Sequence, residues 1–168
     1  MKLARTTIQR EPSIRKVDVE RFSLTSSNSF DQVVAALNAA IGHPDIKEFW
    51  ESAHAKSVTE LEAMVQKSVG NAGLMLFVEF DHGAIVRKET GQEAPRILRF
   101  VIGKMARRVP DAGSYAPVTV LVDERADGVH LSYDRMASIL KPYGNAEELQ
   151  VARDLDARVE ALFASAAA

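Results

Sequence analysis

The most regular pattern of apolar and polar positions lies in two neighbouring segments, residues 118–124 and 129–134. Apolar side chains occupy every second position in both: Val118, Val120, Val122, Val129, Leu131 and Tyr133. This two-residue period is typical of strands with one buried face. Between the segments, Asp127 and Gly128 supply the positive backbone angles that a tight turn requires. The pattern predicts a β-hairpin.

Three further apolar runs predict strands over residues 17–24, 73–80 and 96–102. Residues 73–80 are apolar on both faces, with Met75 and Phe77 opposite a set of four: Leu74, Leu76, Val78 and Phe80. We expect a turn at residues 81–83, and either a short strand or an irregular arm over residues 84–93.

Three segments have apolar residues at helical spacing, and each begins with a capping pair, in which a side-chain oxygen binds a free amide of the first turn. The pairs are Ser29 with Gln32, Thr59 with Glu62, and Asn145 with Glu148. Gly42, in a left-handed conformation, and Pro44 end the first helix, and Gly70 ends the second. Residues 45–56 predict one short helical turn, and residues 104–109 predict at most two.

The order of these elements sets the expected fold class. Helices and strands do not alternate strictly, and a hairpin is present, which favours an α+β fold. We predict a two-layer sandwich with a mainly antiparallel sheet of four to five strands, about the usual number, and helices packed on one face. Residues 1–16 are expected to form a loose N-terminal tail and residues 17–166 a single α+β domain.

Composition narrows the function classes. The chain is 46% hydrophobic and 26% charged, with a net charge of −2 and no cysteine. The absence of a basic field argues against a nucleic-acid partner. The longest apolar run, residues 74–78, is far shorter than the roughly 20 residues of a membrane helix, so no membrane partner is expected. A chain without disulfides or thiolate ligands fits a reducing cytoplasm.

Several short motifs follow one another in a recognisable order. They are Gly73-Leu74-Met75-Leu76-Phe77, Asp81-His82-Gly83, Ile102-Gly103, Tyr115-Ala116-Pro117, Asp127-Gly128, Tyr133-Asp134 and Ala152-Arg153-Asp154-Leu155-Asp156. In order and spacing they resemble the family known as "domain of unknown function 302". The resemblance implies a compact α+β fold, commonly dimeric, with no established activity and no agreed catalytic residues. Lys104 and Met105 stand where similar members have Asn-Pro, so this chain departs from the family pattern there.

His82 is the sharpest candidate for chemistry. A histidine in a turn at a strand end, with an ordinary pKa of about 6.5, is suited to proton transfer. Asp81 is placed beside it to orient the ring. The structural alternative is that His82 caps the turn. The four histidines of the chain do not have the spacing of metal ligands, and no nucleotide-binding motif is present, so we expect no metal site and leave the cofactor unknown.

A second group of residues suggests ligand binding. Arg107, with Lys104 and Arg108, would offer cations to an anionic small molecule at a short helix, although such charge runs are often only solvated. Tyr115 and Tyr133 are positioned to donate hydrogen bonds. We predict that His82, Arg107, Tyr115 and Tyr133 border one concavity, because all four follow or end predicted strands.

Three functions therefore remain open. The first is a small-molecule binding or sensing domain, which polar residues at strand ends favour. The second is an enzyme that uses His82 as a general acid or base. The third is a dimeric scaffold or interaction protein without a ligand. A homodimer is expected because Met75, Phe77, Val101 and Leu121 would otherwise leave an apolar patch on the second face of the sheet.

Overall fold

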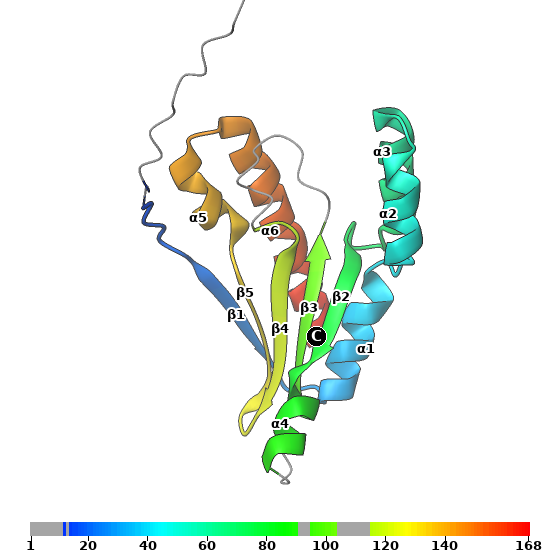
Figure 1. Ribbon diagram of the computed structural model, residues 1–168. Helices are drawn as coiled ribbons and strands as arrows, with labels where there is room; N and C mark the ends of the chain where they lie inside the picture. The colour runs from blue at the N-terminus through cyan, green and yellow to red at the C-terminus, as the bar shows by residue number, and fades with distance from the viewer. Residues whose placement is uncertain (1–11, 13, 91–94, 104–114) are drawn as a thin grey trace, which may run out of the picture.

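The computed structural model describes residues 12, 14–90, 95–103 and 115–168. Five strands and six α-helices follow one another along the chain (Figure 1). They are β1 (Arg21–Ser26), α1 (Phe30–Ala40), α2 (Ile46–His54), α3 (Val58–Ser68), β2 (Met75–Asp81), α4 (His82–Thr90), β3 (Ile97–Gly103), β4 (Val118–Arg125), β5 (Gly128–Asp134), α5 (Met136–Leu140), the 3-10 turn η2 (Lys141–Tyr143) and α6 (Ala146–Ala167). The predicted helix over residues 104–109 and most of the predicted tail lie outside the described residues.

The strands form one sheet in the order β1-β5-β4-β3-β2, and every neighbouring pair is antiparallel. One face packs on α1 and α6, which lie behind the sheet in Figure 1. The core between the layers includes Phe30 of α1, Phe100 of β3 and Phe163 of α6, all almost fully buried. The predicted α+β sandwich with a mainly antiparallel sheet is confirmed.

The hairpin of β4 and β5 forms where the alternation predicted it. Val120 pairs with Tyr133 and Val122 with Leu131, so the apolar residues of both strands share the core face. The turn differs in detail from the prediction, because Gly128 has a positive φ of 137° but Asp127 does not.

Helix starts follow local hydrogen-bonding chemistry. Ser29 and Gln32 form the predicted capping box of α1, and Asn145 caps α6. The box of α3 uses Ser57 and Glu60 in place of the predicted Thr59 and Glu62.

Helix α4 follows β2 directly, at residues where we expected a turn and then a short strand or an irregular arm. The carboxylate of Asp81 accepts the Ala84 amide at 2.8 Å, so the last residue of β2 also caps α4.

Two glycines let the end of α1 approach the end of α3. A Cβ on Gly42 would lie 1.9 Å from the Ser68 carbonyl oxygen, and one on Gly70 would lie 2.4 Å from that of Ala40. The amides of Gly42 and Gly70 both donate to the Leu74 carbonyl at 2.9 Å. Gly42 does not have a positive φ, so the prediction that it ends α1 in a left-handed conformation is wrong. A glycine is needed at this position because a side chain would collide with the end of α3.

A register shift between Leu76 and Val78 changes which side chains of β2 face the core. Leu76 pairs with the buried Ile102, but Val78 pairs with Val101 and Phe80 with Arg99. Val78 and Phe80 are therefore turned outward, with 38% and 44% of their surface exposed. The prediction that they share a face with Leu74 and Leu76 is wrong, because a bulge inverts the alternation that follows it.

The side of the sheet turned away from α1 and α6 carries a mixed surface. Its central side chains come from β2, β3 and β4: Val78, Phe80, Arg99, Val101, Thr119 and Leu121. We call this surface the open face. Met75, which we expected on it, is fully buried with Phe49 of α2 and Val65 of α3. The α2–α3 hairpin thus covers the Met75 end of the second face and leaves the central part uncovered by any described helix (Figure 1).

Candidate functional site

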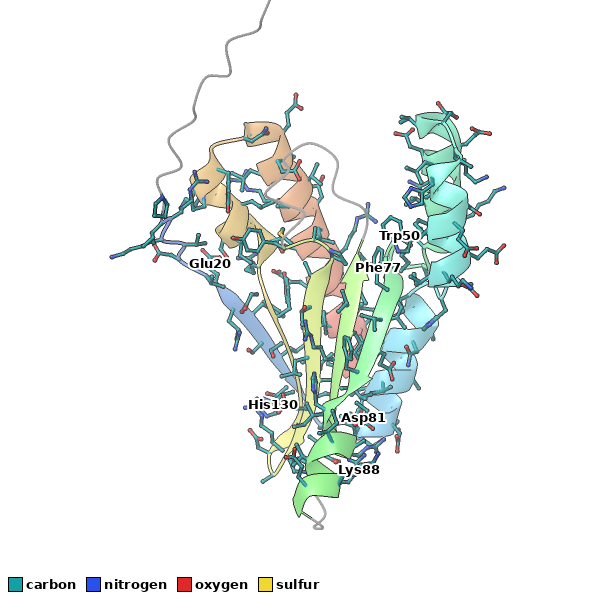
Figure 2. The ribbon with its side chains drawn as sticks, viewed as in Figure 1. Glu20, Trp50, Phe77, Asp81, Lys88 and His130 are labelled. Atoms are coloured by element: carbon teal, nitrogen blue, oxygen red, sulfur yellow. The ribbon has the colours of Figure 1, made fainter. Side chains whose placement is uncertain are left out.

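Asp81 and His82 lie at the lower end of the sheet, where β2 meets α4 (Figure 2). The Asp81 carboxylate is occupied by the Ala84 amide and by Arg87, whose guanidinium lies 3.3 Å away. The His82 ring stacks on Phe80 with centroids 6.1 Å apart. Both residues therefore have local structural partners, but the residue that caps α4 is Asp81 and not His82.

Tyr115 and Tyr133 lie elsewhere. Strands β3 and β4 separate β2 from β5, and three strand spacings correspond to roughly 14 Å. The structure brings Tyr115 and Tyr133 to one pocket but does not bring His82 to it. The prediction of a single concavity is wrong for His82, because sheet order, which strand ends alone do not reveal, decides the distance. Arg107 lies outside the described residues.

The pocket that Tyr115 and Tyr133 share has a volume of about 350 Å³ and is lined by residues of α5 and of β1, β4 and β5. Its polar wall comes from strand residues that point away from the core: Arg21, Thr119, Ser132 and Asp134. The Arg21 guanidinium binds both carboxylate oxygens of Asp134, at 2.7 and 3.0 Å. This contact raises the pKa of Arg21, and the pair leaves that wall without net charge.

The opposite wall of the pocket is apolar. Met136 and Ile139 of α5 and the ring of Tyr115 contribute to it, and Leu121 of β4 adds an apolar side chain beside Thr119 and Ser132. Tyr115 is held by Tyr143, with ring centroids 6.5 Å apart and hydroxyl oxygens 3.3 Å apart. An apolar wall facing a few polar groups is the usual composition of a small-molecule site.

The hydroxyl of Tyr133 is not available as a reactive group. It lies 3.1 Å from a carboxylate oxygen of Glu160 and 3.3 Å from the backbone carbonyl of Asp156, both in α6. Burial raises the pKa of Tyr133 well above its ordinary value, and the charges of Asp156 and Glu160 raise it further. The phenol therefore stays protonated and ties β5 to α6.

Asp156 is a structural residue of this region that the sequence analysis missed. Its side chain, 2% exposed, accepts the amides of Met136 and Ala137 at 2.8 and 2.9 Å. Burial raises the pKa of its carboxyl group, and the two amide bonds act in the opposite direction. Asp156 thereby holds the first turn of α5, which carries Met136 and Ile139 to the pocket. The sequence feature that could have revealed this role is the position of Asp156. It is an acidic residue within the apolar stripe of α6, one helical turn after Ala152 and one before Val159.

A second depression, of about 380 Å³, lies between α5 and α6. Arg135 lies 2.9 Å from Glu160 and 3.1 Å from Glu20, so the charges in its centre are paired. Figure 2 places Glu20 at the upper left, at the end of the sheet opposite to Asp81. Within the described residues, no three histidine, aspartate or glutamate side chains are grouped so that they could hold a metal ion.

His130 makes a short hydrogen-bonded chain on the outward side of β5. Its Nε2 lies 2.8 Å from a carboxylate oxygen of Asp127, and its Nδ1 lies 3.4 Å from the Thr25 hydroxyl. The contact with His130 lowers the pKa of Asp127. His130 does not line the pocket under α5, so we assign it a role in joining β1 to the hairpin.

A five-stranded antiparallel sheet with α1 and α6 on one face, the α2–α3 hairpin over one end of the other, and a pocket beside α5 defines a small α+β domain. The chain belongs to the family described as domain of unknown function DUF302, whose pattern matches residues 49–166. Strand β1 and helix α1 precede the matched part. No curated protein matches the chain.

A solved structure has a similar fold. It is an uncharacterized conserved DUF302 protein from Bacillus stearothermophilus, and it is 9% identical to this chain. The similarity covers 87% of this chain and 97% of that one, with a TM-score of 0.56. At this identity the similarity supports the fold alone. None of the helices in the described ranges is long and apolar enough to span a membrane.

Proposed function

We propose that this protein is a cytoplasmic small-molecule binding domain whose site is the pocket under α5. The observation that carries the proposal is the pocket itself, which brings the apolar Leu121 and Ile139 together with the polar Thr119 and Ser132 in about 350 Å³. Small-molecule sites begin at about this size. The absence of cysteine is compatible with a reducing compartment.

The same geometry does not favour the enzyme alternative. His82 lies outside the pocket and stacks on Phe80. Tyr133 offers no base, because its raised pKa keeps the phenol protonated. A binding role needs only the shape and polarity that the pocket has, so it is the simpler proposal.

A blocking substitution tests the proposal. Ser132→Trp places a large ring in the pocket from the outward side of β5, so a ligand that stabilises the wild type should lose its effect. A bound compound at 100 times its dissociation constant stabilises by about 2.7 kcal/mol, which thermal shift against a library of small carboxylates, amides and alcohols detects. The matched control is Ser23→Trp. Ser23 of β1 pairs with Ser132 but is not one of the residues that line the pocket. Equal loss in both variants, or no stabilising compound at all, would contradict the proposal.

A homodimer that packs on the open face is the second candidate. The outward Val78 and Phe80, beside Val101 and Leu121, favour it, because apolar side chains in a contiguous group typically mark an interface. An isologous contact of two such faces would cover them on both copies. This candidate needs no ligand.

Light scattering distinguishes a dimer of this kind. If the open face is the interface, the wild type should have twice the monomer mass and Phe80→Lys should be monomeric, because a buried unpaired lysine is strongly unfavourable. The control is Ile85→Lys, which adds the same charge at an exposed apolar residue of α4. A wild-type monomer over a wide concentration range would rule the interface out.

A further inference from the structure

Among the described residues, Arg99 has no acidic partner, although it lies in the middle of the open face. Its cross-strand neighbours are the apolar Phe80 and Leu121. The guanidinium carbon lies 5.5 Å from the centre of the Phe80 ring, and one terminal nitrogen lies 3.4 Å from the hydroxyl oxygen of Thr119. Its Nε is buried without a hydrogen-bond partner. No carboxylate of the described residues pairs with Arg99.

Other arginines on or beside the sheet have a carboxylate partner. Arg21 binds Asp134, and Arg125 binds Asp123. These two pairs use the carboxylates that β4 and β5 present on their outward side. Arg99 therefore retains a full positive charge beside apolar side chains, where water screens it less than at an open surface. An arginine in such a setting is suited to bind a carboxylate through its planar fork.

Arg99 is not one of the lining residues of the pocket, but its hydrogen-bond partner Thr119 is, so the guanidinium lies at the border of the pocket. Thr119, which accepts its hydrogen bond, is part of the polar wall of the pocket, and Leu121 belongs to both surfaces. We propose that the ligand of the pocket is a monocarboxylate with an apolar body. Its carboxylate binds Arg99 and Thr119, and its body lies against Leu121 and Ile139. This inference rests on the proposed binding function.

The lining residues of the pocket indicate that its ligand carries a single negative charge. The Arg21–Asp134 pair is neutral as a unit, and the α5 side of the pocket is apolar. A second charged group on the ligand would find no free partner among the described lining residues.

The experiment compares two probes of equal size, octanoate and octanamide, by titration calorimetry. The wild type should bind octanoate about tenfold more tightly, which is about 1.4 kcal/mol and typical of a charge-assisted contact. Arg99→Gln should remove this preference and leave octanamide binding unchanged, and Arg99→Lys should retain part of it. The control is Arg153→Gln, which removes an exposed cation from the depression on the other side of α5.

Each result has one interpretation. Equal affinity for the two probes in the wild type, or an unchanged preference in Arg99→Gln, would overturn the carboxylate inference but leave the pocket as a site. No binding of either probe, together with no stabilising compound in the thermal-shift screen, would overturn the binding function and the inference with it. If Arg99→Gln changes only the oligomeric mass, the open face binds a second copy and the inference is wrong.

Discussion

Asp156→Ala should unfold with a free energy roughly 3 kcal/mol lower than the wild type. The substitution leaves the amides of Met136 and Ala137 without their acceptor, and an unsatisfied buried donor costs about 1–3 kcal/mol. In a domain of this length, such a loss lowers the melting temperature by roughly 6–12 °C. Denaturant unfolding and calorimetry measure the two quantities.

Two further variants show whether the amide contacts are the cause. Asp156→Asn keeps one acceptor oxygen, so its loss should be intermediate. Asp154→Ala removes an exposed carboxylate of the same helix that binds only Gln150, and we expect a change within about 0.5 kcal/mol. If Asp156→Ala behaves like Asp154→Ala, the carboxylate does not hold α5 and the pocket has another support.

Gly42→Ala should destabilise the protein by about 3 kcal/mol, at the upper end of what overpacking costs. The added methyl group would lie 1.9 Å from the Ser68 carbonyl oxygen. That atom belongs to the backbone, so it cannot rotate away, and the ends of α1 and α3 must separate. The amide of Ala72 donates to the Ala40 carbonyl across this junction, and the amide of Gly70 shares its acceptor, the Leu74 carbonyl, with Gly42. Both amides should then lose protection in hydrogen exchange.

Gly144→Ala is the matched control for this glycine. Gly144 has a φ of 70° and no atom within 4 Å of a built Cβ, so its substitution costs only backbone strain, about 1 kcal/mol. It should leave the protection of Gly70 and Ala72 unchanged. Normal protection at these two amides in Gly42→Ala would show that the junction tolerates a side chain.

The sequence by itself determined most of the secondary structure and the fold class. The alternation in residues 118–134 predicted the hairpin, because a period of two has only one structural solution when one face is buried. Ser29 and Asn145 marked the starts of α1 and α6, since a cap is a local hydrogen bond between residues a few positions apart. Tyr115 and Tyr133, chosen because each lies near the end of a strand, both line the pocket, and their role in ligand binding stays a prediction.

Tertiary structure decided the features that depend on residues distant in the sequence. A single-residue register shift turned Phe80 outward, and alternation alone does not show where a bulge occurs. Sheet order separated His82 from Tyr133. The role of Asp156 exists only because α5 begins beside α6. Asp123 and Asp134, the outward carboxylates of β4 and β5, pair with Arg125 and Arg21 and not with Arg99. Helices, strands and caps follow from the geometry of neighbouring residues in the chain. The contacts of Phe80, Asp156 and Arg99 follow from the packing of distant segments, which a short stretch of sequence does not specify.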